Sequence, residues 1–293
     1  MGKPLRLSVG LATANRPAIA TQLLEVIARQ TLQPDRIIVS VPQASDLAPA
    51  CAGMPGLEIL LGARGLTRQR NAILGHLGDA DIICFFDDDF VPHRDYLAAM
   101  VAAFQRDPGL VGATGQVIAD GITGAGYSFA EADALLAGSA SFETSQRPIY
   151  NAYGCNMAFR TAPILANALQ FDEHLPRYGW LEDVDFSRQA ARFGTIARVN
   201  AAIGVHLGVK SGRQSGLCFG YSQIANPLYL IGKGSYAWPR ATWLMGRNIG
   251  MNLLRAPWPE PHIDRRGRIV GNITAIADGL RGRMNPQRIE TLS

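Results

Sequence analysis

Short apolar runs alternate with amphipathic segments through the first hundred residues. Strands are predicted at four apolar runs, Leu5–Leu11, Arg36–Val41, Leu57–Leu61 and Asp81–Phe86. Apolar residues at helical spacing predict three helices, one beginning at Pro17 and the others over Leu66–Leu77 and His93–Phe104. Continuously apolar strands that alternate with amphipathic helices indicate a parallel sheet covered by helices on both faces.

The pattern changes after Leu110. A strand is predicted over Val111–Ala119, and residues 120–147 are rich in Gly, Ser and Ala with weak periodicity, so we expect a mobile or substrate-facing segment. Further elements are predicted as strands over Tyr150–Arg160, Thr195–Val199 and Ile203–His206 and as helices over Glu182–Arg192 and Ile269–Leu280. Since no clean linker interrupts this order, we expect one α/β domain over residues 1–216 and a C-terminal helical extension over 217–293.

Charge is distributed unevenly along the 293 residues, whose formal net charge is +4. Residues 1–204 hold 16 Lys and Arg against 20 Asp and Glu, whereas residues 205–293 hold 12 against 4. No acidic residue lies between Asp185 and Glu260. The chain therefore has an acidic first part and a basic tail.

Cysteine usage and hydropathy exclude several classes of protein. The four cysteines lie far apart with no C-x-x-C pair, which argues against a zinc ribbon and a disulfide scaffold. Cys84 falls inside an apolar run, where a buried free thiol is expected. The sequence has no secretory signal pattern and no stretch of about 20 apolar residues. These features predict a cytoplasmic protein.

Three adjacent carboxylates, Asp87, Asp88 and Asp89, directly follow a predicted buried strand. Ligands of open parallel sheets bind at the carboxyl ends of the strands. Alternate side chains of an extended segment share a face, so Asp87 and Asp89 are placed to address one Mg²⁺ or Mn²⁺. The alternative is an acidic cap on the helix that follows.

Three other features have both a chemical and a structural interpretation. Arg70 brings a cation to where phosphates would bind, or it is a solvated helix charge. Glu182 and Asp183 lie at the start of a helix after a Gly-Trp turn. They either cap the helix or supply a general base. His206 ends a strand ahead of a basic run at 210–213. It is either a structural residue or a third metal ligand.

Taken together, these motifs resemble inverting glycosyltransferases of the GT-A fold, specifically family 2 of bacterial polysaccharide assembly. The resemblance covers nearly the whole chain and rests on six motifs in the family's order: Ser8–Pro17, Gly65–Asn71, Phe85–Asp89, Gly154–Arg160, the Phe171-Asp172-Glu173 and Glu182–Asp185 block, and His206. It implies a Rossmann-like, mostly parallel sheet flanked by helices. It also implies a nucleotide-binding half over about 1–110 and an acceptor half over 111–216.

The resemblance implies a role for each matching residue. Five residues would bind the nucleotide-sugar: Thr13, Arg16, Arg70, Asp87 and Asp88. Four would bind the acceptor: Gly154, Asn156, Trp180 and Glu182. Asp89 and His206 would hold Mg²⁺ or Mn²⁺ on the diphosphate, and Asp183 would deprotonate the acceptor hydroxyl. The implied acceptor is a glycan or a polyprenyl-linked sugar in cell-surface polysaccharide synthesis.

Two departures from the family pattern leave the donor base open between UDP, GDP and dTDP. The family often has an Asp after the second strand, but here Asp46 is the nearest acid. The usual Pro before Thr13 is Ala12.

The basic tail also has two interpretations. From Tyr221 to Trp258 aromatic residues alternate with basic ones, as on a surface that contacts an anionic membrane, which would place the protein peripherally on the cytoplasmic membrane face. Alternatively, the aromatics pack on the catalytic domain and the arginines are solvated. We expect no nucleic-acid partner, because no binding motif accompanies the charge.

Two other functions compete with glycosyl transfer. A sugar-nucleotide nucleotidyltransferase shares a parallel sheet and an acidic metal site, but it usually needs a Gly-rich phosphate loop, and Gly10–Arg16 contains one Gly. A non-catalytic scaffold with the same fold is the other alternative.

Overall fold

A computed structural model describes residues 4–139, 145–210, 215–258 and 260–292. The nine strands of one sheet run in the order β3-β2-β1-β4-β8-β6-β9-β5, with β7 beside β9. Their bounds are β1 Leu7–Ala12, β2 Arg36–Val41, β3 Leu57–Leu61, β4 Ile82–Asp87, β5 Phe90–Pro92, β6 Leu110–Asp120, β7 Gln146–Pro148, β8 Asn156–Arg160 and β9 Thr195–His206. The pairs from β3 to β4 and the pair β6–β9 are parallel, and β8 is antiparallel to both of its neighbours.

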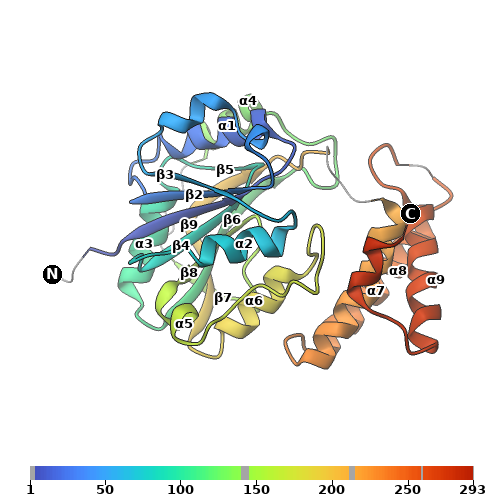
Figure 1. Ribbon diagram of the computed structural model, residues 1–293. Coiled ribbons are helices and arrows are strands. Elements are labelled where there is room, and N and C mark those ends of the chain that lie inside the picture. The colour runs from blue at the N-terminus through green and yellow to red at the C-terminus, as the bar shows by residue number, and fades with distance from the viewer. Residues whose placement is uncertain (1–3, 140–144, 211–214, 259, 293) are drawn as a thin grey trace.

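Helices cover both faces of this sheet (Figure 1). One face packs against α1 (Pro17–Ile27) and α3 (Tyr96–Arg106), and the other against α2 (Leu66–Leu74), α5 (Thr161–Ala166) and α6 (Glu182–Ala190). Alternate residues of β4 enter the two cores, with Phe86 on the α1 side and Phe85 on the α2 side. Burial of both faces explains why these strands are continuously apolar.

The structure confirms the α/β class, and several elements differ from the sequence-based expectation. The strand predicted over Tyr150–Arg160 begins only at Asn156, as β8. The two strands predicted on either side of residues 200–202 form one strand, β9, because register shifts against β6 absorb the irregularity. The weakly periodic segment contains α4 (Phe129–Ala137), which begins at a capping box formed by Ser128 and Glu131. Residues 140–144 of that segment, and 211–213 of the basic run at 210–213, lie outside the described residues.

The tail forms three helices, α7 (Gly216–Lys233), α8 (Trp238–Arg255) and α9 (Arg265–Leu280), beside the α/β body (Figure 1). They share a small core around Tyr221 and Ala275. The backbones of α7 and α9 approach closely: a Cβ on Gly220 would lie 2.2 Å from the Arg268 carbonyl oxygen. None of the helices in the described part of the chain combines the length and apolarity that a membrane span needs.

Candidate active site

The candidate site lies where the carboxyl ends of several strands meet. Ala12 at the end of β1 is in register with Ser40 of β2 and with Asp87 of β4. At the end of β9, His206 pairs with Phe90 of β5 and with Asp120 of β6. Because Phe90 follows the three aspartates directly, this pairing brings His206 beside them.

Asp87, Asp89 and His206 form a compact group that can hold a metal ion. Each offers a ligand atom, and these atoms lie within 4.8 Å of one another. His206 Nε2 lies 3.4 Å from Asp89 Oδ1, and its Nδ1 lies 3.0 Å from Asp120 Oδ1. The Tyr153 hydroxyl donates to the other oxygen of Asp120 at 3.0 Å. Asp120 and Tyr153 therefore orient the imidazole from behind, as partners of metal-binding histidines do.

The electrostatics of this group favour a cation. Burial raises the pKa of Asp87 to about 6, and repulsion from Asp89 adds to the rise, although Arg70 opposes it. Burial lowers the pKa of His206, but hydrogen bonds to Asp120 and Asp89 outweigh it and raise the value to about 10. In the isolated chain a proton on His206 thus partly balances the carboxylates, and a divalent cation would replace that proton.

Asp88 faces the loop after β1. Its Oδ2 accepts a hydrogen bond from the Thr13 hydroxyl at 2.7 Å, and its Oδ1 lies 2.9 Å from Arg16 Nη1. The sequence-based prediction groups these three residues at the nucleotide, and the structure brings them together. The neighbouring acid, Asp46, accepts from the Asn15 N–H at 2.6 Å and so holds the same loop.

The position of Arg70 agrees with neither of its two sequence-based interpretations, a cation beside phosphates or a solvated helix charge. Its side chain is 1% exposed, and it is neither solvated nor among the described residues that line the cavity below. One Nη atom lies 2.5 Å from Glu182 Oε1, and the other lies 2.8 Å from both Asp87 Oδ1 and the Gly154 carbonyl oxygen. Arg70 therefore links β4 to α6 and to the loop that contains Gly154, which we call the glycine loop.

Asp183, the expected base, is half-buried in the first turn of α6. Its Oδ2 accepts a hydrogen bond from the Gly154 N–H at 3.0 Å. Burial raises the pKa of Asp183, while the backbone N–H groups of Gly154 and Val184 oppose the rise. Burial also raises the pKa of Glu182 to about 8, opposed by Arg70 and reinforced by Asp183. Glu182 turns toward Arg70 in the interior.

Asn156 lies in the interior rather than on the acceptor side. Its side chain is fully buried at the start of β8, and its Oδ1 accepts hydrogen bonds from the Thr114 hydroxyl and from the Gly115 N–H. In this structure the Asn156 side chain is therefore not open to an acceptor, and its acceptor role stays a prediction. The glycine loop reaches the site through Gly154.

A cavity of about 1700 Å³ opens at this edge of the sheet. Its described wall includes seven of the residues predicted for the site: Thr13, Arg16, Asp87, Asp88, Asp89, Trp180 and His206. It does not include Arg70, Gly154, Asn156, Glu182 or Asp183. The cavity continues past Trp180 to residues of α7, α8 and α9. The C-terminal helices therefore form part of its wall.

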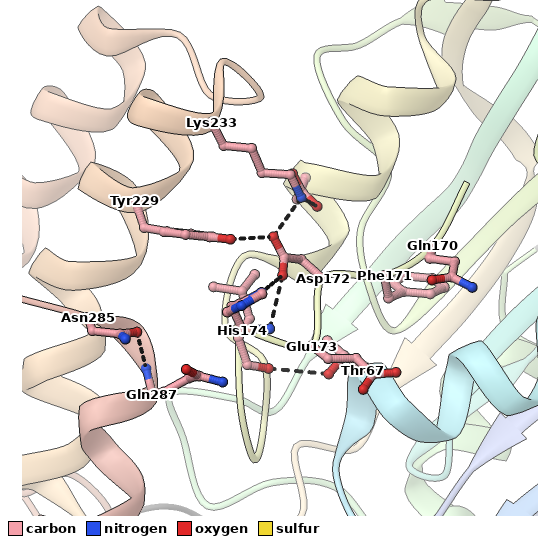
Figure 2. Close-up of polar contacts among 12 residues, drawn as sticks. Thr67, Gln170, Phe171, Asp172, Glu173, His174, Tyr229, Lys233, Asn285 and Gln287 are labelled. Carbon is pink, nitrogen blue, oxygen red and sulfur yellow. Dashed lines mark hydrogen bonds and ion pairs between the residues drawn. The ribbon is translucent and has the colours of Figure 1, made fainter. Parts of the chain in front are cut away.

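A polar junction joins α7 to the segment that carries Asp183 (Figure 2). Lys233 Nζ lies 2.7 Å from Asp172 Oδ2 and 2.7 Å from Asp185 Oδ2. The Tyr229 hydroxyl donates to Asp172 Oδ2 at 2.9 Å. Sequence reasoning missed Lys233 and Asp120. No motif links Lys233 to residues so distant in the chain. Asp120 could have been found, because it follows a predicted apolar strand, as the three adjacent aspartates do.

The fold and the carboxylate edge agree with those of a GT-A glycosyltransferase. Residues 8–164 match the model of Glycosyl transferase family 2, and the chain belongs to this family. None of the curated proteins matches the chain.

Two solved structures share the fold along nearly the whole chain, each with a TM-score of 0.58. S. aureus TarS 1-349 in complex with UDP-GlcNAc is 14% identical, and the match covers 98% of this chain and 84% of that one. The mannosyltransferase PcManGT from Pyrobaculum calidifontis, in complex with GDP-Man and Mn²⁺, is 16% identical, with 98% and 85% covered. A longer S. aureus TarS chain is 17% identical with a TM-score of 0.54; the match covers 78% of this chain but only 40% of that one.

Proposed function

We propose that this protein is a metal-dependent inverting glycosyltransferase that moves a sugar from a nucleoside diphosphate to a glycan or polyprenyl-linked acceptor in cell-surface polysaccharide synthesis. The observation that carries the proposal is the convergence of Asp87, Asp89 and His206 on the wall of a large cavity. The two solved structures with UDP-GlcNAc and with GDP-Man and Mn²⁺ support a nucleotide-sugar donor.

The donor atoms of this group fit a divalent cation. Two carboxylates and one imidazole suit Mg²⁺ or Mn²⁺, which also take phosphate oxygens. We propose Asp89 and His206 as ligands, with Asp87 in the same group. When bound, the ion would supply positive charge to the departing diphosphate.

The remaining residues would bind the donor and activate the acceptor. Thr13, Arg16 and Asp88 would contact the nucleotide, and the base stays open between UDP, GDP and dTDP. Asp183 would take the proton of the acceptor hydroxyl as its oxygen attacks the anomeric carbon and the bond to the diphosphate breaks. One base and a single in-line displacement invert the anomeric centre.

The residues around Asp183 would orient it and the acceptor. The Gly154 N–H fixes one oxygen of Asp183, and Arg70 holds Glu182 and Asp87 in place. Trp180, on the cavity wall, is the acceptor contact we propose.

We propose residues 1–216 as the catalytic domain, with the donor half over 1–110 and the acceptor half over 111–216, and residues 217–293 as an extension. We place the protein in the cytoplasm, because all four cysteines are buried free thiols.

The chemistry is tested by transfer with Asp183→Asn and by the anomeric configuration of the product. We expect the variant to lose transfer by a factor of at least about 1000 while it still binds the nucleotide, because only proton removal is affected. Nuclear magnetic resonance should show inversion. Unchanged turnover, or a product with retained configuration, would overturn the mechanism. Turnover of a nucleoside triphosphate with a sugar 1-phosphate would identify a nucleotidyltransferase, and nucleotide binding with no turnover on any acceptor would favour a scaffold.

A further inference from the structure

The outer surfaces of α8 and α9 are apolar, although both helices lie on the outside of the bundle. Their exposed large apolar side chains are Trp238, Trp243, Leu253 and Leu254 on α8 and Val270, Ile273, Ile276 and Leu280 on α9. Ile273 is 61% exposed and Leu280 is 86% exposed. The α9 residues recur every three or four positions, so they form one stripe along that helix. We call these two surfaces the outer faces of α8 and α9.

Three of the four tryptophans of the chain belong to the same region and are 65–67% exposed: Trp238, Trp243 and Trp258. The tyrosines of the tail behave differently. Tyr221 is fully buried in the bundle, and Tyr229 donates to Asp172 at the junction. Of these two tyrosines only Tyr229 contacts the α/β body, Tyr221 packs within the tail itself, and the three tryptophans are exposed. Indole rings favour the boundary between water and lipid.

Basic residues outnumber acidic ones in the tail. Of its four acidic residues, Glu260 and Asp278 pair with arginines, whereas Asp264 and Glu290 are exposed. Helix α8 carries no acidic residue. Asp278 of α9 is buried and lies 3.5 Å from Arg283 Nη2 and 3.6 Å from Arg288 Nε. Between the helices, Glu260 pairs with Arg265 at 2.8 Å. The exposed basic residues that flank the outer faces are Arg255, Arg266 and Arg281, whereas Arg240 lies over the Tyr150 ring of the α/β body, 4.4 Å from its centroid.

We propose that the outer faces of α8 and α9 dock on the surface of an anionic lipid bilayer. Apolar helix faces that are edged with arginine and tryptophan lie in the plane of a membrane, with the apolar side chains below the lipid headgroups. A second copy of the chain fits this surface less well, because arginines would outnumber acidic residues on both sides of such an interface. Lipid phosphates supply the charge that these arginines lack.

The docked helices also connect the bilayer to the catalytic cavity. Five residues of α8 and α9 line the cavity whose wall includes Asp89: Arg247, Asn248, Met251, Arg265 and Arg268. A lipid-linked acceptor would thus enter the cavity along helices that already lie on the membrane. This last step rests on the proposed transfer function, whereas the docking itself rests on the surface alone.

Co-sedimentation with liposomes tests the docking. We expect the full chain to sediment with vesicles of phosphatidylcholine and phosphatidylglycerol, and to bind pure phosphatidylcholine at least about tenfold more weakly. Ile273→Gln with Leu280→Gln should weaken binding at least about tenfold, because two apolar side chains no longer enter the lipid. Arg255→Gln and Arg281→Gln should each weaken it about fivefold, the equivalent of ~1 kcal/mol per arginine.

Two controls make the result specific. Leu61→Gln with Leu165→Gln removes leucines of similar exposure, 66% and 55%, from the α/β body and should leave binding unchanged. Asp183→Asn should also bind vesicles normally, so a failed transfer reaction and a failed docking remain distinguishable. Circular dichroism checks that each variant folds. Equal binding to both vesicle types, or equal loss in the Leu61 control, would overturn the proposal. So would a stable dimer that Ile273→Gln separates, or binding to nucleic acid in place of lipid.

Discussion

The Lys233 junction is expected to hold the helix that carries Asp183, and its removal should be measurable. Lys233 lies in the last turn of α7 and contacts Asp172 and Asp185 at 2.7 Å each. The side chain of Asp185 is 0% exposed and that of Asp172 is 7% exposed. Lys233→Met keeps most of the side chain but leaves two buried carboxylates without their cation.

The size of the effect follows from burial and from the pKa of Asp172. Removing one partner of a buried ion pair costs about 3–5 kcal/mol. Lys233 is itself 31% exposed, so water reaches its ammonium group and reduces this figure. Burial raises the pKa of Asp172, but Lys233, the His174 N–H and Tyr229 outweigh it and lower the value from 3.8 to about 2. At about 1.36 kcal/mol per pKa unit this shift corresponds to about 2.5 kcal/mol, shared among three donors. We therefore expect Lys233→Met to lower the free energy of unfolding by about 1–3 kcal/mol.

Urea denaturation and steady-state kinetics measure the two consequences. The position of α6 sets the position of Asp183, so kcat should fall in Lys233→Met while KM for the donor stays near the wild-type value. Lys233→Arg keeps the charge and should retain most of both quantities. A Lys233→Met protein with wild-type stability, within about 0.5 kcal/mol, and with wild-type kcat would refute the reasoning.

Three further predictions concern unfolding at low pH, a substitution at Gly154, and removal of the Asp120 carboxylate beside His206. Because the folded-state pKa of Asp172 lies below the unfolded value of about 3.9, its stabilisation is complete above that value and is lost as the pH falls toward 2; acid unfolding followed by circular dichroism checks this loss. Gly154→Ala would place a Cβ 3.3 Å from that of Asp183, so kcat should fall up to about 100-fold, and an unaltered kcat would contradict the contact. Asp120→Asn removes the carboxylate behind His206 and should weaken Mn²⁺ binding about 10- to 100-fold in a calorimetric titration; equal affinity would mean that Asp120 does not orient the imidazole.

Much of the α/β body could be predicted because its signals are local. The strands β2 and β3 have the predicted bounds, since an apolar run of five or six residues between polar turns is enough to specify a buried strand. The edge that holds Asp87 and Asp89 followed from the same runs, because parallel strands end together. The motif order then indicated the family, which the match over residues 8–164 confirms.

The remaining features depend on contacts between distant residues. The alternation of side chains along a strand does not say which face of the sheet Asn156 occupies. The pairing of β8 with β6 places its side chain against Thr114 in the interior. An arginine on an amphipathic helix is usually exposed, but Arg70 is buried because Glu182 and Asp87 reach it from two other elements. Such placements are set by packing and not by the local pattern.

The central claim is that Asp87, Asp89 and His206 hold a divalent cation against the diphosphate of a nucleotide donor. Calorimetric titration of UDP, GDP and dTDP into the full chain, with and without Mn²⁺, tests it most directly, with Asp89→Asn as the matched variant. We expect one nucleotide to bind with Mn²⁺, and to lose at least about tenfold in affinity when Mn²⁺ is withheld or Asp89 is replaced. Equal binding with and without Mn²⁺, or binding of none of the three nucleotides, would contradict the claim.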